Sequence, residues 1–157
     1  MEKKLKQKLI NYFKNYFGDN LISIVFFGSR VRAEARLTSD YDIFLFTKEL
    51  PKRPLERQKF VRKAISLKFD QRISIHAKTK KEFESGFPPL YLDLGVDGQI
   101  LYDSDNYIQK KLLRIQEIIK EAGLYRVKRN GYHAWEWKNQ PGPYWSITWD
   151  GFYDRTG

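Results

Sequence analysis

The sequence of 157 residues contains no cysteine, and this absence excludes several kinds of site. Without cysteine a chain can form neither disulfides nor thiolate metal sites, so zinc ribbons and cysteine nucleophiles are ruled out. Any bound metal must therefore be held by oxygen or imidazole ligands.

Long apolar runs are also missing from the sequence. No stretch approaches the roughly 20 apolar residues that cross a bilayer, and the first residues lack the apolar segment of a secretory signal. No internal repeat or low-complexity segment is present, which argues against a repeat array. We expect a cytoplasmic protein with no membrane partner.

What the sequence does contain is typical of one soluble globular domain. Hydrophobic residues make up 41% of the chain and aromatic residues 16%, against 31% charged residues. The net charge of +10, from 29 basic and 19 acidic residues, would attract polyanions such as RNA or a nucleoside triphosphate. The basic residues are spread over several segments, so solvated helix faces in a basic or heat-adapted proteome are the alternative.

Helix-like and strand-like patterns alternate along most of the chain. Apolar residues at helical spacing predict helices over 5–17 and 55–68, and a polar segment suits a short helix over 30–37. Runs rich in β-branched and aromatic residues predict strands over 21–27, 41–46, 72–77 and 99–102. This alternation favours an α+β or α/β fold.

Two further helices are marked by polar residues at their starts. Thr79, followed three residues later by Glu82, has the pattern of a capping box. Asp105 is expected to cap a C-terminal helix whose apolar positions keep helical spacing up to Gly123.

The last part of the chain is aromatic and punctuated by glycine and proline. We expect a β-hairpin over 124–137 and an irregular tail beyond Pro141. The aromatic side chains could stack on the bases of an RNA end. Packing of an aromatic hairpin onto the sheet is the favoured interpretation.

Two aspartates at the start of the second predicted strand carry the first chemical signal. Side chains at positions i and i+2 of a strand project from the same face, so Asp40 and Asp42 can reach one point in space. Two such carboxylates repel each other, and a divalent cation relieves the repulsion. Mg²⁺, which prefers a few carboxylates plus substrate phosphates, suits this pair.

A Gly-Ser turn upstream of the two acids supplies the second signal. Gly28 lets the backbone approach a ligand closely, and the amides of Ser29 and Arg30 would lie at the start of a helix, where a phosphate is favoured. A triphosphate held there could be bridged to Asp40 and Asp42 by a metal, which describes a phosphoryl or nucleotidyl transfer site. Taken alone, each signal is more often an ordinary turn or a solvated acid pair.

The stretch GSRVRAEARLTSDYDIFLF resembles the signature of the polymerase-β-like nucleotidyltransferase superfamily, and most closely that of small prokaryotic, notably archaeal, single-domain members. The family pattern is Gly-Ser, a short arginine-rich helix, then Ser-Asp-x-Asp. Ala33 departs from it, because glycine is usual there, and we expect alanine to stiffen the short helix. The matching residues are Gly28, Ser29, Arg30, Arg32, Glu34, Ser39, Asp40 and Asp42.

The resemblance fades after about Gly123. We therefore expect a nucleotidyltransferase domain over 1–123 and an aromatic-rich extension over 124–157 that packs on the same domain. The resemblance implies a mixed sheet with flanking helices. It also implies Mg²⁺, with ATP or another nucleoside triphosphate as donor of a nucleotide to a hydroxyl, and pyrophosphate as leaving group.

The three-carboxylate form of this family places a third acid on a later strand, where it helps to activate the attacking hydroxyl. Ser74 occupies that position here, and serine is a poor metal ligand and a poor base. Asp70 and His76 are the groups that could compensate. The alternatives are that Asp70 is an ordinary turn residue and that His76 is an ordinary, partly buried ring.

The leading hypothesis is a magnesium-dependent nucleotidyltransferase. In it Gly28, Ser29 and Arg30 hold the triphosphate, and Asp40 with Asp42 hold the metal. The acceptor would be RNA, tRNA or a protein, and the resemblance includes members that adenylylate a paired toxin. The alternative is a catalytically impaired nucleotide- or RNA-binding module, or an antitoxin-like partner protein, that retains the nucleotide pocket.

Overall fold

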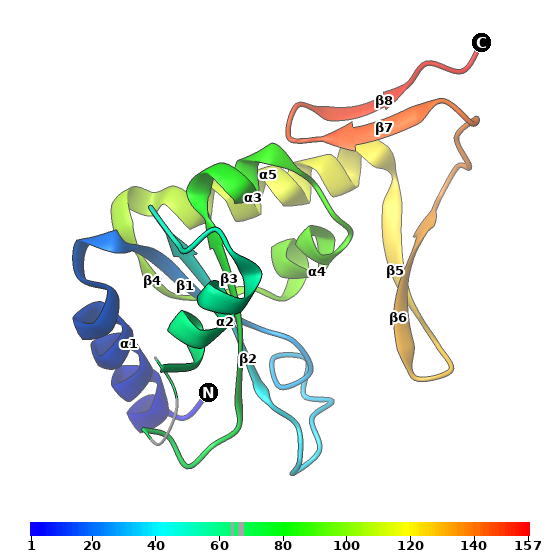
Figure 1. Cartoon of the computed structure of the whole chain (residues 1–157). Helices are drawn as coiled ribbons and strands as arrows, with labels where there is room; N and C mark the ends of the chain where they lie inside the picture. Colours follow the sequence, from blue (N-terminus) through cyan, green and yellow to red (C-terminus); the bar gives the residue numbers. More distant parts are fainter. Residues whose placement is uncertain (64, 66–67) are drawn as a thin grey trace.

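A four-stranded mixed sheet forms the centre of the computed structural model, which describes all residues except 64, 66 and 67 (Figure 1). The strand order is β3-β2-β1-β4, with β1 antiparallel to both of its neighbours and β2 parallel to β3. The expected α+β fold with a mixed sheet is confirmed. The strands are β1 (Leu21–Phe27), β2 (Tyr41–Thr47), β3 (Ile73–Thr79) and β4 (Gln99–Asp103).

Helices cover both faces of this sheet (Figure 1). Since alternate strand residues face opposite sides, the two central strands supply two separate cores. Leu9 and Phe13 of α1 pack with Ile24 and Phe26 on one face. The other core joins Val25 and its neighbours to the helices on the opposite face. The helices are α1 (Lys3–Phe17), α2 (Pro54–Lys63), α3 (Lys80–Ser85), α4 (Leu90–Asp97) and α5 (Tyr107–Ala122).

The C-terminal extension forms two β-hairpins. The first consists of β5 (Leu124–Arg129) and β6 (Tyr132–Trp137), and it stands beside the sheet as an arm from the end of α5 (Figure 1). This hairpin confirms the expectation for 124–137. The second consists of β7 (Trp145–Thr148) and β8 (Gly151–Asp154), so the expectation of an irregular tail beyond Pro141 is wrong.

Aromatic packing explains why the tail is ordered. The Trp149 ring packs 5.0 Å from that of Phe83, and its Nε1 donates to the carbonyl oxygens of Phe83 and Gly86 at 3.1 and 3.0 Å. Trp137 likewise contacts Trp145, with ring centroids 5.0 Å apart. Phe83 and Gly86 are 66 and 63 residues from Trp149, so the local pattern gives no sign of these contacts.

The segment over 30–37 is a series of turns and not the helix that we expected. Ala33 has a φ of 57°, in the left-handed region that a right-handed helix does not contain. The backbone therefore reverses at this residue. Alanine does not stiffen a helix there, and the glycine usual in the family would meet the conformation without strain.

Two helix boundaries differ from the expected ones. Helix α2 ends at Lys63, and the remainder of the helix expected over 55–68 lies partly outside the described residues. Asp105 is not the cap of α5, since its own φ is 55°. The carboxylate of Asp103 accepts instead from the N–H groups of Ile108 and Gln109 at 2.9 and 3.0 Å.

The capping box of α3 is confirmed: Thr79 Oγ1 accepts from the Glu82 N–H at 3.1 Å, and Glu82 accepts from the Thr79 N–H at 2.9 Å.

In the part of the chain that the structure describes, none of the helices combines the length and apolarity needed to cross a membrane.

Candidate active site

The turn after β1 meets the second aspartate directly. Gly28 has a φ of +88°, and a side-chain carbon built on it would lie 2.9 Å from Asp42 Cγ and would collide with the carboxylate itself. Only glycine satisfies both the conformation and the space. Gly28 and Asp42, which are 14 residues apart along the chain, therefore lie next to each other in the fold.

The backbone of this turn is compact and leaves donors available. The Gly28 carbonyl oxygen accepts from the N–H groups of Val31 and Arg32 at 3.1 and 3.4 Å, and the Ser29 carbonyl oxygen accepts from Glu34 at 3.0 Å. Within the described residues, no hydrogen bond uses the amides of Ser29 and Arg30 or the Ser29 hydroxyl. Because no helix follows the turn, these individual donors, and not a helix dipole, would contact an anion.

The Arg30 side chain is hydrogen-bonded to the loop that precedes Asp40. Its Nε and Nη2 donate to the Ser39 carbonyl oxygen at 3.1 and 2.9 Å, and its guanidinium lies 4.1 Å from the centre of the Tyr41 ring. The guanidinium is therefore engaged next to Asp40. In this arrangement the amide of Arg30, and not its side chain, is the group left for a phosphate.

Asp42 lies between the two neighbouring strands. It pairs with Phe27 of β1 and with Ser74 of β3. Desolvation is the main reason that the pKa of Asp42 is raised, and the charge of Asp40 raises it further, while the charges of His76 and Arg32 act in the opposite direction. A divalent cation would favour the ionised form of this carboxyl.

Asp40 lies just before β2 and has one poorly satisfied oxygen. Its Oδ1 is 3.1 Å from Nε of Arg72, whose side chain is largely exposed. The contact lacks hydrogen-bond geometry, so this buried oxygen has no hydrogen-bond partner among the described residues. An orphaned buried carboxylate oxygen beside a second, desolvated carboxylate is the donor set that a hard cation prefers.

Ser74, which we expected at the position of the third acid, lies directly opposite Asp42 in the parallel pair. His76 is exposed and lies on the same face, with its ring 5.5 Å from that of Phe27. Asp70 is exposed in the bend before β3. Outside the three undescribed positions, no three carboxylates or imidazoles come close enough together to hold a metal, so neither Asp70 nor His76 completes such a group.

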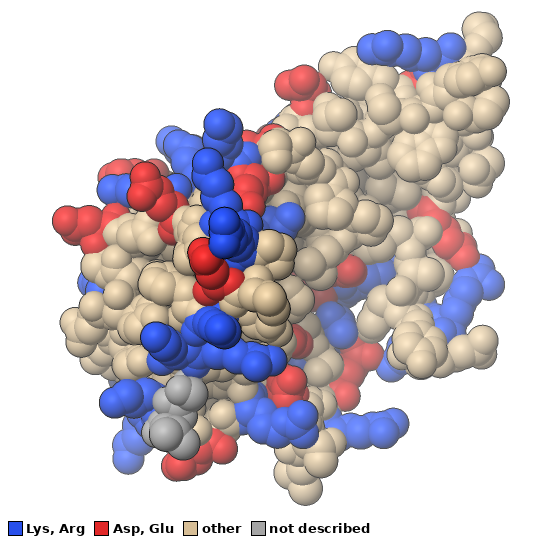
Figure 2. All heavy atoms as spheres, viewed as in Figure 1, with Lys and Arg blue, Asp and Glu red and all other residues tan. Residues whose placement is uncertain are grey.

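A set of ion pairs beside the turn was not anticipated from the sequence. Arg32 contacts Asp97 of α4 at 2.9 Å and Glu34 at 2.8 Å. Asp97 also forms an ion pair with Arg126 of the β5–β6 hairpin, and Glu34 forms one with Lys128 of the same hairpin. Figure 2 shows acidic and basic side chains close together where the β5–β6 hairpin approaches the rest of the molecule. No local pattern pairs charges that lie 29 to 94 residues apart, although Arg32 and Glu34 do belong to the motif.

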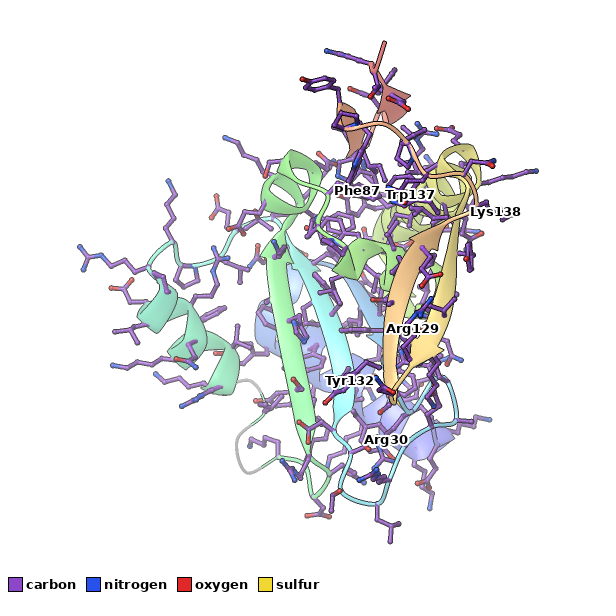
Figure 3. All side chains as sticks on the ribbon, turned by 90° about the vertical axis from the view of Figure 1, so that its right-hand side faces the viewer. Arg30, Phe87, Arg129, Tyr132, Trp137 and Lys138 are labelled. Atoms are coloured by element: carbon purple, nitrogen blue, oxygen red, sulfur yellow. The ribbon has the colours of Figure 1, made fainter. Side chains whose placement is uncertain are left out.

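The tip of the hairpin lies beside the site. In Figure 3 the tip of the hairpin, near Arg129 and Tyr132, lies just above Arg30, and Tyr132 projects from the side of the hairpin nearer β2. The contacts of Glu34 with Lys128 and His133, at 2.7 and 3.0 Å, show that the turn and the arm meet there.

A comparison with protein families decides the class of this site. Residues 7–122 match the family model described as polymerase beta, nucleotidyltransferase. The chain belongs to this family. It is 34% identical over 129 residues to a protein of Methanocaldococcus jannaschii named "Putative protein adenylyltransferase MJ1305", with 76% of this chain and 87% of that protein covered.

Solved structures show the same nucleotidyltransferase fold. A chain of a toxin–antitoxin crystal structure with AMP-PNP superposes with a TM-score of 0.55 at 16% identity, over 73% of this chain and 86% of that chain. A chain of the structure of the tri-AMPylated HEPN toxin of Shewanella oneidensis in complex with MNT antitoxin gives a TM-score of 0.50 at 16% identity, over 76% and 87% of the two chains.

Proposed function

We propose that this nucleotidyltransferase transfers the adenylyl group of ATP to a hydroxyl group of a protein. The hydroxyl oxygen would bond to the α-phosphorus, the bond between the α- and β-phosphates would break, and pyrophosphate would leave while the hydroxyl proton passes to solvent. The observation that carries the proposal is the contact of Gly28 with the Asp42 carboxylate, because it brings the Gly-Ser turn, with its free backbone donors among the described residues, next to one of the paired acids.

Each residue of the site has a proposed task. The amides of Ser29 and Arg30 and the Ser29 hydroxyl would bind phosphate oxygens beside Gly28, whose lack of a side chain lets the Asp42 carboxylate lie against the turn. The Arg30 side chain holds the loop before Asp40 through the Ser39 carbonyl oxygen. Cytoplasmic ATP is the donor that we propose, in keeping with the relative's name.

Mg²⁺ fits the two acids. The buried Oδ1 of Asp40, which has no hydrogen-bond partner among the described residues, and the desolvated carboxyl of Asp42 are its proposed ligands. When bound, it would neutralise charge on the triphosphate and on the pyrophosphate that leaves. The Arg72 guanidinium that now lies beside Asp40 is mostly exposed, so a cation would displace it at little cost.

A protein acceptor is favoured over RNA or tRNA by the name of the relative, "Putative protein adenylyltransferase MJ1305". A toxin-like partner belongs to this proposal as one kind of protein acceptor. The positive charge of the chain supports RNA binding only in a general way, because Figure 2 shows the basic residues distributed over the body of the molecule.

A second candidate function is nucleotide binding without turnover. It is favoured by Ser74, which stands opposite Asp42 where a third carboxylate would assist the attacking hydroxyl. On β3, the charge of His76 acts on the pKa of Asp42, which it lowers.

Incubation with ATP labelled at the α-phosphate, Mg²⁺, cell lysate and total RNA tests both candidates. Adenylyl transfer predicts label on protein with the intact chain and none with the Asp40→Asn, Asp42→Asn variant. Label on RNA would refute the protein acceptor. The absence of any label together with metal-dependent ATP binding by calorimetry would favour the second candidate. Circular dichroism of the variant should show an intact fold, since removing two crowded charges relieves repulsion.

A further inference from the structure

Asp97 is the centre of the ion-pair set beside the motif turn. It is only 8% exposed, and its carboxylate lies between two arginines from different parts of the chain. Arg32 donates to Oδ2 from the turn at 2.9 Å, and Arg126 donates to both oxygens from β5 at 2.7 and 2.9 Å. The two hydrogen bonds from Arg126 fix the orientation of the Asp97 carboxylate. Arg126 of β5 therefore sets the position of the oxygen to which Arg32 donates.

Glu34 makes a second junction with the same hairpin. Its carboxylate is 2.7 Å from Lys128 Nζ, 3.0 Å from His133 Nε2 and 2.8 Å from Arg32 Nε. These hydrogen bonds, that of Lys128 foremost, lower the pKa of Glu34 to about 2. Arg32 is thus held at two nitrogens by two carboxylates, each of which is anchored to the hairpin.

The motif turn needs such external support. It contains no helix, its internal backbone hydrogen bonds are few, and Ala33 is in the left-handed region. A loop of this kind would sample several conformations unless other groups restrict it, and ordering it at the moment of binding would cost affinity. The match to the family model ends at residue 122, so the supporting hairpin lies beyond the residues that this match covers.

We propose that the β5–β6 hairpin is a positioning element of the active site. Arg126 and Lys128, acting through Asp97 and Glu34, hold Arg32 and with it the turn over 28–34 in the conformation that receives the triphosphate. The part of the proposal that concerns the nucleotide rests on the proposed function; the part that concerns the turn does not.

The test compares Arg126→Gln with Arg129→Gln in the full-length chain. Arg129 lies on the same strand, but it pairs with Glu136 within the hairpin and touches neither junction. Without nucleotide, hydrogen exchange over 28–36 should become at least tenfold faster in Arg126→Gln, with exchange in β1 and β2 unchanged. The Kd for ATP with Mg²⁺, measured where both variants are fully folded, should rise at least tenfold. Arg129→Gln should change neither quantity.

Two more variants separate positioning from stability. Lys128→Gln, at a half-exposed residue, tests the Glu34 junction if Arg126→Gln does not fold, and it should accelerate exchange over the same segment. Arg126→Lys retains the charge and should restore part of the affinity. Unchanged exchange over 28–36 in the folded variants overturns the proposal, and so does unchanged ATP affinity where the wild-type chain binds ATP. If the wild-type chain binds no ATP while exchange responds as described, the nucleotide function fails and the positioning of the turn stands.

Discussion

At the scale of single residues, the site depends most on Gly28. Its positive φ and its contact with Asp42 make Gly28→Ala both strained and sterically blocked. We expect the variant to lose about 1 to 3 kcal/mol of unfolding free energy and at least about tenfold in ATP affinity, because the turn must move away from the acids.

Gly86→Ala is the matched control, since Gly86 has a φ of −144° and nothing within 4 Å of the added carbon. Thermal melts and calorimetry measure the two effects. A Gly28→Ala chain that binds ATP like the wild type would show that the turn is not where the phosphates lie.

Ala33 shows how a departure from a motif can mislead. We expected alanine to replace a helical glycine harmlessly, but the structure places it at φ 57°. Ala33→Gly should therefore stabilise the protein by about 0.5 to 1 kcal/mol, a rise of roughly 2 °C in Tm. Ala77→Gly in β3 should instead lower Tm. Differential scanning calorimetry of both variants decides the sign.

Ser74 raises the question of how fast the enzyme works. Ser74→Asp would place a third carboxylate opposite Asp42. If adenylyl transfer is limited by activation of the acceptor hydroxyl, the rate should rise at least about tenfold. Ser74→Asn, similar in shape but neutral, should leave the rate near that of the wild type. Equal rates for the two variants would refute the role that we assign to this position.

At the scale of elements, local pattern was sufficient for most of the regular structure. The four sheet strands, α1 and the β5–β6 hairpin lie within a few residues of their predicted ranges. Helix α1 repeats apolar residues at helical spacing, whereas β1 is a short apolar run that is buried at every position. The turns over 30–37 and the β7–β8 hairpin escaped prediction. Their conformations depend on hydrogen bonds to the carbonyl oxygens of Ser39, Phe83 and Gly86, and these bonds form only in the folded chain.

The start of α5 gives a test at this scale. Asp103, and not the expected Asp105, accepts the free N–H groups of the helix, and it also accepts from the buried Ser23 hydroxyl at 2.6 Å. Asp103→Asn should lower the unfolding free energy by about 1 to 2 kcal/mol. Asp105→Asn should have little effect, since asparagine tolerates the left-handed conformation. Urea denaturation would contradict this account if the two variants were equally stable.

At the scale of the whole molecule, the sequence predicted which residues form the acid pair and the turn. It did not predict the ion pairs through which the C-terminal extension contacts the turn. The net charge of +10 favours polyanionic partners only in general and does not single out one of them. The boundary near Gly123 between domain and extension stays a prediction. The ion pairs of Asp97 and Glu34 cross that boundary, so motif and extension are coupled by contacts that only the folded chain reveals.

This coupling predicts how the protein responds to acid. The folded-state pKa of Glu34 is about 2, below its ordinary value of 4.5, and that of Asp97 is lowered by Arg126 and Arg32 although its burial acts in the opposite direction. A carboxyl with a lowered folded pKa stabilises the folded state fully above its unfolded pKa, and this contribution is lost as the pH falls through the folded value. The hairpin should therefore stay docked above about pH 4.5 and come loose between about pH 4.5 and 2.

All four tryptophans lie in the extension, at 135, 137, 145 and 149, so their fluorescence reports on this region alone. We expect the emission to shift to the red as the pH falls through this window, before the far-ultraviolet circular dichroism of the sheet and helices changes. Glu34→Gln removes one junction and should move the fluorescence transition to higher pH, whereas Asp105→Asn, outside the junctions, should not move it. Coincident loss of both signals, at the same pH in both variants, would show that the two carboxylates do not hold the arm against the motif.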